Sequence, residues 1–203
     1  VIRLTSGHQA KIEEKPEVKK AGGVYYTPAY IVDYIVKQTV GVLCDGKTPK
    51  QIAKLTVLDP ACGSGSFLLG AYRFLLNYHR DWYVKDGPEK HRKELFQASS
   101  GEWRLTTQEK KRILLNNIYG VDVDAQAVEV AQWSLYLKLL EEETTTSAKQ
   151  RLLEFARTAN LKKLLPDLGK NIVCGNALIG RDVLDGQLFP ADAERKLNPM
   201  NFE

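Results

Sequence analysis

A glycine-bearing segment after a short apolar run carries the clearest chemical signal in this sequence. Residues 57–67 read Val-Leu-Asp-Pro-Ala-Cys-Gly-Ser-Gly-Ser-Phe. A predicted strand ends in an acid, Asp59, and leads through a tight turn to Gly63 and Gly65, which precede a helix. Glycine lets a backbone pass close beneath a ligand where a Cβ atom would clash. The segment is therefore a candidate loop for a nucleotide-type ligand.

Three such ligands compete for this loop. A P-loop requires Gly-Lys-Ser/Thr, and no lysine lies within residues 59–65, which excludes it. A dinucleotide site requires a third glycine where this chain has Leu68, and Asp59 would sit poorly beside a pyrophosphate. S-adenosylmethionine instead presents an ammonium and a sulfonium, and an acid attracts both cations. The alternative is a structural turn with an incidental pair of glycines.

Two further strand ends carry polar side chains. Asp122 follows a second apolar run and is well placed to accept hydrogen bonds from two ribose hydroxyls, while Val123 could pack on an adenine face. Asn176 follows a third run, and its amide offers a donor and an acceptor to an adenine edge. In the alternative interpretation Asp122 only caps the next helix, as Asp124 is expected to do, and Asn176 is an ordinary turn residue.

A fourth segment, Gly-Val-Tyr-Tyr-Thr-Pro at residues 23–28, predicts the start of a helix. Thr27 is a good N-cap, and Pro28 suits the first helical position. The free N–H groups of this end could bind a carboxylate such as that of a methionine moiety. An ordinary helix start with two core tyrosines is the alternative. One apolar face is predicted for the helix, formed by Ile31, Ile35, Val36, Val40 and Leu43.

The elements that position these residues alternate between strands and helices. Strands are predicted at 55–58, 118–123 and 171–174, and helices from 28, from 66, near 106–114, at 125–142 and at 149–157. Thr106 and Glu109 predict a capping box. Residues 81–105 are polar and are interpreted as an insertion. Strand–loop–helix units in series imply an open α/β fold with a mainly parallel sheet, whose ligands bind beyond the carboxyl ends of the strands.

Composition narrows the class of protein. The chain has 203 residues, 43% hydrophobic and 27% charged, which fits one globular domain, and no apolar run approaches the roughly 18 residues of a membrane span. Cys44, Cys62 and Cys174 show no CxxC pair and no neighbouring histidine cluster, so neither a metal site nor a disulfide framework is expected, and a cytoplasmic setting follows. A net charge of +4 permits a polyanionic partner without requiring one.

Together, the strings GVYYTP, DPACGSGSF, YGVDVDAQAVEVAQ and NIVCGNAL resemble the gamma-order N6-adenine DNA methyltransferases. Within that family they most resemble the methyltransferase part of combined type II (IIG) restriction–modification enzymes, over about residues 20–182. The resemblance implies a Rossmann-like class I methyltransferase fold, S-adenosylmethionine as cofactor, and duplex DNA as partner of the full-length protein.

The resemblance also implies the roles of individual residues. Tyr26, Thr27 and Pro28 would line the methionine end of the cofactor, and Asp122 would hold the ribose. The loop that would cradle the methionine and sulfonium comprises Asp59, Pro60, Ala61, Cys62, Gly63, Ser64 and Gly65. Val123, Asn176 and Ala177 would contact the adenine, although many relatives carry Asp where this chain has Asn176.

One family feature is absent. The catalytic signature, Asn or Asp followed by Pro-Pro and an aromatic residue, has only a partial match at Asn198-Pro199-Met200-Asn201, with no apolar strand before it. We therefore expect no catalytic residue, and a truncated domain at 24–185 between an N-terminal arm or linker, 1–23, and a tail, 186–203. These residues would bind cofactor without methylating DNA. Methylation of RNA or of protein glutamine, and a non-catalytic scaffold, remain alternatives.

Overall fold

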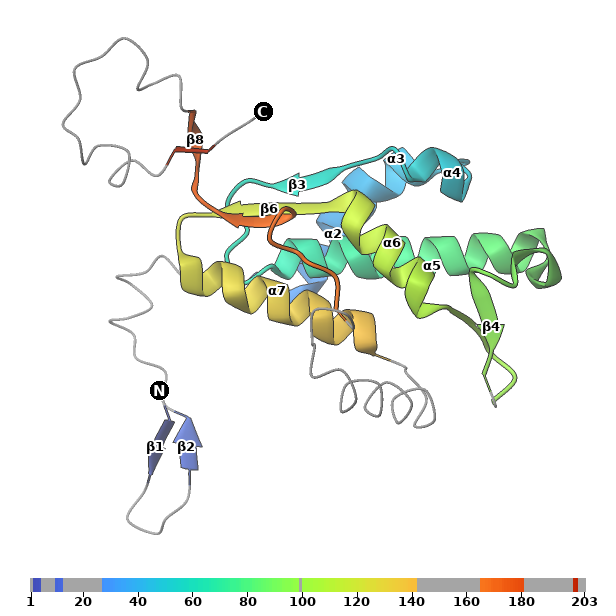
Figure 1. The fold of residues 1–203 in the computed structure, drawn as a ribbon, viewed down its shortest axis with the longest axis horizontal. Coiled ribbons are helices and arrows are strands. Elements are labelled where there is room, and N and C mark those ends of the chain that lie inside the picture. Colours follow the sequence, from blue (N-terminus) through green and yellow to red (C-terminus); the bar gives the residue numbers. More distant parts are fainter. Residues whose placement is uncertain are drawn as a thin grey trace.

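A short parallel sheet forms the centre of the fold in the computed structural model (Figure 1). The structure describes residues 2–4, 10–12, 27–98, 100–141, 165–180 and 199–200. The strand order is β3 (Val57–Asp59), β6 (Ile118–Asp122) and β7 (Ile172–Cys174). Both neighbouring pairs are parallel. The predicted α/β fold with a mainly parallel sheet is confirmed, and each predicted strand is present within two residues of its expected bounds.

The register of the sheet aligns the ends of its strands. Asp59 of β3 pairs with Gly120 of β6, and Asp122 at the end of β6 pairs with Cys174 at the end of β7. Because all three strands run in the same direction, the segments that follow them emerge from one edge of the sheet. This edge carries the candidate site residues.

Two long helices, α5 (Ser66–Asp86) and α7 (Ala125–Leu140), lie on one side of the sheet (Figure 1). Leu68 of α5 is fully buried and packs directly on Gly120 of β6. A Cβ atom on Gly120 would lie 2.6 Å from the Cδ1 atom of Leu68. Helix α6 (Thr107–Asn117) leads directly into β6. The buried core of these elements includes Leu75, Ile113, Leu114, Ile118, Leu135 and Leu139.

The predicted helix caps are confirmed in part. Asp124 Oδ1 accepts a hydrogen bond from the Gln126 N–H at 2.9 Å and caps α7. Thr106 caps α6 through the Glu109 N–H at 3.3 Å, but the Glu109 carboxylate instead accepts from Arg112 and Tyr83. Only one half of the predicted capping box is therefore formed, because a nearby guanidinium offers the carboxylate stronger, charge-assisted bonds.

The helix after residue 27 departs from its prediction in two ways. Helix α2 (Ala29–Val36) has Pro28, not Thr27, at its N-cap, with no side-chain cap. Pro28 has an extended ψ of 141°, so it lies outside the helix and contributes its carbonyl oxygen, which accepts from the Ile31 and Val32 N–H groups. A π-helical turn, η1 (Lys37–Gly41), and α3 (Val42–Cys44) follow.

The buried face of this helical run is also different. Val32, Val36, Val40 and Cys44 are buried, whereas Ile35 and Leu43 of the predicted face are 39% and 48% exposed. The π turn closes i to i+5 and is wider than an α turn, so the buried positions advance in steps of four. Next along the chain, α4 (Pro49–Ile52) has Thr48 and Gln51 as a complete capping box.

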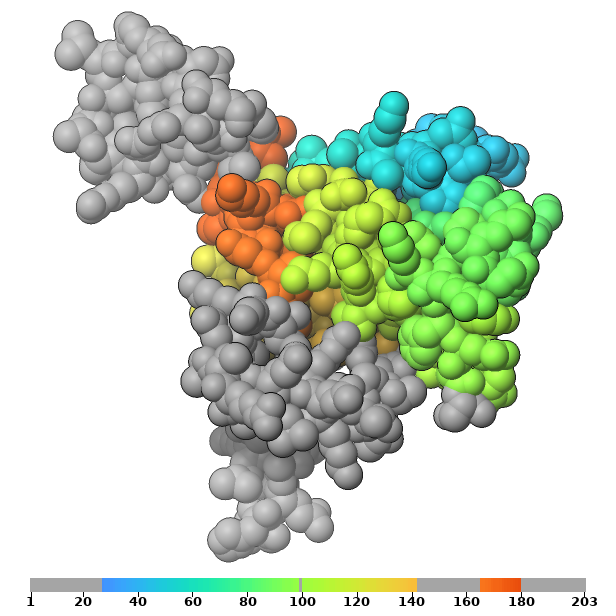
Figure 2. All heavy atoms as spheres, turned by 45° about the vertical axis from the view of Figure 1, so that its right-hand side comes forward, coloured from blue at the N-terminus to red at the C-terminus, as the bar shows by residue number. Residues whose placement is uncertain are grey.

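Residues 81–105, interpreted as an insertion, are built into the domain. Helix α5 continues to Asp86, and η2 (Pro88–His91), β4 (Leu95–Gln97) and β5 (Trp103–Leu105) follow. Leu95 and Leu105 are only 2% and 4% exposed. In Figure 2 this green segment is continuous with the body of the described residues. The segment's polar composition concealed the few apolar residues that anchor it.

Two short pairs of strands, β1 (Ile2–Leu4) with β2 (Ala10–Ile12) and β8 (Asn176–Gly180) with β9 (Pro199–Met200), complete the described secondary structure. The first pair is antiparallel and lies within the expected arm, and the second pair is parallel. The predicted helix at 149–157 lies outside the described residues. The expected domain bounds, residues 24 and 185, also lie outside the described residues. Among the described helices, none is long and apolar enough to cross a membrane.

The contact between α2 and α5 gives a first prediction. In Gly70→Ala the new Cβ would lie 2.4 Å from Cγ1 of Val32, a stiff and buried side chain. We expect urea unfolding to show a loss of about 1–3 kcal/mol from overpacking. The matched control is Gly41→Ala, whose Cβ would meet nothing closer than Phe74 at 3.4 Å. The control should equal or exceed the parent in stability, and equal stabilities of the two variants would contradict the packing.

Candidate functional site

Asp122 connects all three segments that leave the carboxyl edge of the sheet. Its Oδ2 atom accepts a hydrogen bond from the Gly63 N–H at 2.7 Å, and its Oδ1 atom accepts from the Asp124 N–H at 2.9 Å. Its main-chain oxygen accepts from the Gly175 N–H, also at 2.9 Å. One residue therefore holds the loop after β3, the turn before α7 and the turn after β7.

Main-chain contacts fix the rest of the loop at residues 59–65. Asp59 Oδ1 accepts from the Ala61 N–H at 3.1 Å, and the Cys62 N–H donates to the Val121 carbonyl at 2.9 Å. The Gly65 N–H closes the turn on the Cys62 carbonyl at 2.8 Å. The buried Cys62 side chain packs against Gly120, where a Cβ atom would lie 3.1 Å from the Cys62 Sγ atom. The loop is thus shaped by the protein itself, independently of any ligand.

The two glycines of the loop serve different purposes. Gly63 has a φ of +52°, and a Cβ atom there would meet nothing within 4 Å, so its main chain faces open space. Gly65 has a φ of +84°, and its Cβ would lie 3.0 Å from the Cβ of Ala131 on α7. The expectation that both glycines admit a ligand is therefore supported by the geometry of Gly63 alone. Gly65 provides the left-handed turn into α5 and its close packing on α7.

The loop is electrostatically negative. Burial raises the pKa of Asp59, and the nearby charge of Asp122 raises it further, although the hydrogen bond from Ala61 opposes both. Burial, Asp59 and Asp122 raise the pKa of Cys62 to about 12, so its thiol is neutral at physiological pH. Within residues 27–141 and 165–180, neither Asp59 nor Asp122 forms an ion pair with a basic side chain. Such a place favours a cationic ligand.

A cavity of about 240 Å³ adjoins the glycine loop. Thr27 and Ser64 both line it, so the start of α2 and the loop after β3 meet there. Ser66 and Ser134 add hydroxyl groups to its wall. Sequence reasoning missed Ser134, because its place on α7 becomes relevant only once α7 packs beside α5. Arg73 of α5 also lines this cavity.

The remaining predicted site residues vary in their placement. Val123 is 67% exposed at the sheet edge, and Ala177 is half-buried. Asn176 follows β7 as predicted, but it begins another strand, β8, and its Oδ1 atom accepts from the Leu178 N–H at 3.0 Å. Pro60 is exposed, and Tyr26 lies outside the described residues. Across the described ranges, no cluster of His, Cys, Asp or Glu side chains is placed to hold a metal ion.

Comparison with known proteins agrees with this arrangement. Residues 46–182 match the family model described as MmeI, DNA-methyltransferase domain. The chain belongs to this family. The matched range contains β3, β6 and β7 and every predicted site residue except Tyr26, Thr27 and Pro28. The resemblance to the methyltransferase part of combined restriction–modification enzymes is thereby confirmed.

Curated relatives of this family member point the same way. The chain is 34% identical over 178 residues to the type II restriction enzyme and methyltransferase RM.Eco57I of Escherichia coli, covering 88% of the chain and 16% of that protein. It is 29% identical over 199 residues to the putative type II restriction enzyme and methyltransferase RM.MjaORFECS2P of Methanocaldococcus jannaschii, covering 80% of the chain and 15% of that protein.

A third relative is the adenine-specific methyltransferase PglX of Streptomyces coelicolor, 26% identical over 176 residues. That alignment covers 84% of the chain and 11% of PglX. The chain therefore spans between 11% and 16% of the length of these relatives.

The bonds of Asp122 give a second prediction. An amide has one acceptor oxygen, so Asp122→Asn cannot accept from both Gly63 and Asp124 as the carboxylate does. We expect a loss of about 1–3 kcal/mol in unfolding free energy, together with faster hydrogen exchange at the Gly63 amide, measured by NMR.

The matched control for Asp122→Asn is Asp124→Asn. Asparagine caps helices about as well as aspartate, so its stability should stay within about 0.5 kcal/mol of the parent. Unchanged exchange at the Gly63 amide in Asp122→Asn would show that the carboxylate does not hold the loop.

Proposed function

We propose that these residues form the S-adenosylmethionine site of a protein that methylates N6 of adenine in duplex DNA within a restriction–modification system. The observation that carries this proposal is the pair of carboxylates, Asp59 and Asp122, beside the open main chain of Gly63. Two cationic groups distinguish S-adenosylmethionine from most nucleotides, and an acid pair with no basic partner among the described residues complements them.

The relatives support the reaction class. Two of them are named as type II restriction enzymes and methyltransferases, and PglX is named as adenine-specific. Membership of the MmeI DNA-methyltransferase domain family supports DNA as the substrate. The size of the relatives supports a larger protein in which other segments hold the DNA.

Each part of the cofactor has a complementary group in this chain. The cavity beside Ser64 and Thr27 would receive the methionine moiety, with Tyr26 and Pro28 nearby in the sequence. Asp59 and the loop to Gly65 would face the sulfonium, whose methyl group is what the cofactor supplies. Val123, Asn176 and Ala177 would contact the adenine.

Asp122 can hold the ribose while still holding the loop. A carboxylate offers about four acceptor positions, and the N–H groups of Gly63 and Asp124 occupy two of them. The remaining two are available to the ribose hydroxyls. The ribose and capping interpretations of Asp122 are therefore compatible. The cofactor would bind to a carboxylate whose position the protein's own hydrogen bonds already fix.

We infer that the present residues bind cofactor without transferring the methyl group. A duplex adenine must leave the base stack to react, and positioning of its amine would provide most of the rate. The signature that would hold this amine is absent from the sequence. Mixing the purified chain with duplex DNA and methyl-labelled S-adenosylmethionine should give no labelled DNA, and labelled N6-methyladenine would contradict the inference.

The charge argument predicts how cofactor binding responds to substitution and pH. In calorimetry, Asp59→Asn should weaken S-adenosylmethionine about tenfold, the loss of one charge-assisted contact. The same change should weaken S-adenosylhomocysteine less, because its sulfur is uncharged. Asp81→Asn, an exposed change on α5, is the control and should leave both affinities unchanged.

The pH response follows from the direction of the Asp59 pKa. Because this pKa is raised above the usual 3.8, protonation on acidification begins at a higher pH than for a free aspartate. Affinity for S-adenosylmethionine should fall as pH drops through that pKa, and binding there should release a proton. Asp59→Asn should flatten this dependence. An equally steep dependence in the variant, or no binding by the parent chain, would count against the proposed site.

A further inference from the structure

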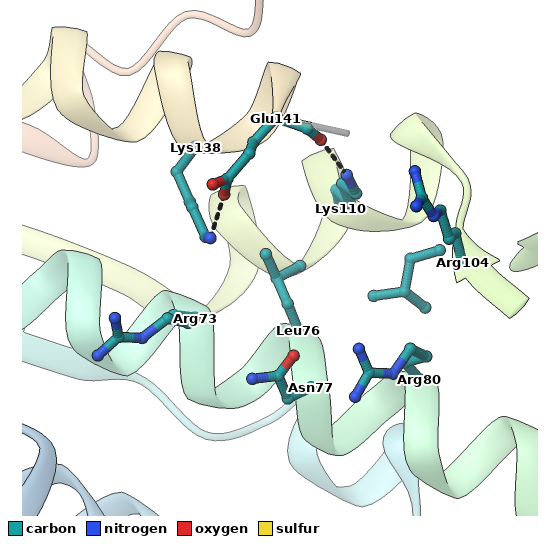
Figure 3. Close-up of a pocket in the computed structure, with 9 residues that line it drawn as sticks. Arg73, Leu76, Asn77, Arg80, Arg104, Lys110, Lys138 and Glu141 are labelled. Carbon is teal, nitrogen blue, oxygen red and sulfur yellow. Dashed lines mark hydrogen bonds and ion pairs between the residues drawn. The ribbon is translucent and has the colours of Figure 1, made fainter. Parts of the chain in front are cut away.

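A second site of opposite charge lies away from the cofactor loop. A cavity of about 40 Å³, partly open to solvent, is lined by residues of α5, β5, α6 and the end of α7. None of the residues 59–65 or 122–124 lines it. Figure 3 shows the side chains of Arg73, Arg80, Arg104, Lys110 and Lys138 arranged around Leu76.

The lining is strongly cationic. Among the described residues that line the cavity, five are basic and one, Glu141, is acidic. Arg73, Asn77 and Arg80 share one face of α5 because they lie at i, i+4 and i+7. Like charges brought together from four elements repel one another. A cavity lined by several cations favours binding of an anion.

Among the described residues, three acids that pair with the arginines lie outside the cavity lining. Arg73 pairs with Asp33, Arg80 with Asp81 at 2.8 Å, and Arg104 with Glu102 at 3.1 Å. These acids lie outside the lining and are 57%, 67% and 68% exposed. Exposed pairs contribute little free energy, so an incoming anion could share or replace them at small cost.

The two lysines are held in place from the α7 side. Lys110 is buried and its Nζ atom donates to the Glu141 main-chain oxygen at 2.7 Å, while Lys138 pairs with the Glu141 carboxylate. Figure 3 shows both contacts as dashed lines at the upper rim of the cavity. Protein contacts therefore hold this rim in place, Arg73 and Arg80 line the cavity from α5, and Arg104 lines it from β5.

We propose that this cavity binds a single phosphate group. A cavity needs about 10–15 Å³ to hold a water, so 40 Å³ matches a few waters or one tetrahedral oxyanion. Arginine guanidinium groups bind phosphate oxygens through paired N–H donors, and three are present. The phosphate belongs either to the backbone of a nucleic acid or to free phosphate.

The phosphate itself is tested on the full chain by NMR of the arginine Nε–Hε groups. Titration with inorganic phosphate, at ionic strength held constant with chloride, should shift the Arg80 and Arg104 signals. Arg80→Gln should weaken the apparent affinity about tenfold. Arg92→Gln, an exposed arginine outside the cavity, is the matched control and should leave it unchanged. This titration needs no cofactor, so its outcome is independent of the proposed function.

The source of the phosphate is tested by fluorescence anisotropy with a labelled DNA duplex at several salt concentrations. If the backbone is the source, Arg80→Gln should weaken duplex binding and reduce the slope of log affinity against log salt by about 1, unlike Arg92→Gln. If inorganic phosphate shifts the arginine signals but duplex affinity is the same in both variants, free phosphate is the source. Signals of Arg80 and Arg104 that respond to neither probe would overturn the proposal.

Discussion

The candidate site depends on one hydrogen bond, from the Gly63 N–H to the Asp122 carboxylate at 2.7 Å. It joins residues 59 positions apart, at the ends of two adjacent parallel strands. A bond from a main-chain N–H to a carboxylate is shorter and stronger than one between neutral groups. Because Asp122 also accepts from Gly175 through its main-chain oxygen, the same residue fixes the relative positions of three strand ends. The site is preorganised because its main-chain loops are bonded to each other.

The glycines around this bond serve two purposes: one leaves the main chain accessible to a ligand, and two allow close packing of the helices. Gly63 leaves its main chain open, whereas Gly65 and Gly120 admit Ala131 and Leu68 at distances that a side chain would obstruct. Pairing of β3 with β6 places Asp59 beside Gly120, two residues before Asp122, so the two carboxylates are near enough for their charges to interact. The electrostatic character of the loop therefore follows from the strand pairing. On the flank of α5, basic side chains from α5, β5, α6 and α7 line a second cavity, and Arg73 lines both this cavity and the one beside Ser64.

The sequence predicted the parts of this structure that rest on local patterns. Apolar runs located β3, β6 and β7, and the alternation of strands, loops and helices predicted that these strands pair in parallel. The helix cap at Asp124 was predicted correctly, because it depends only on a hydrogen bond from the N–H group of Gln126, two residues further along the chain. The start of α2 and its buried face were wrong, because an extended Pro28 and a π turn leave no clear periodic signal. The hairpin at residues 95–105 was missed because two buried leucines, Leu95 and Leu105, anchor an otherwise polar segment.

The sequence identified which residues form the site better than it predicted the contacts between them. Residue types and strand ends selected Asp59, Gly63 and Asp122, but only the fold shows that Asp122 binds Gly63. The central claim is tested most directly by a crystal structure of the chain soaked with S-adenosylmethionine. The account predicts density over Gly63, with the ribose at Asp122 and the sulfonium facing Asp59. Density confined to another part of the molecule, or a bound cofactor with Asp59 turned away, would contradict it.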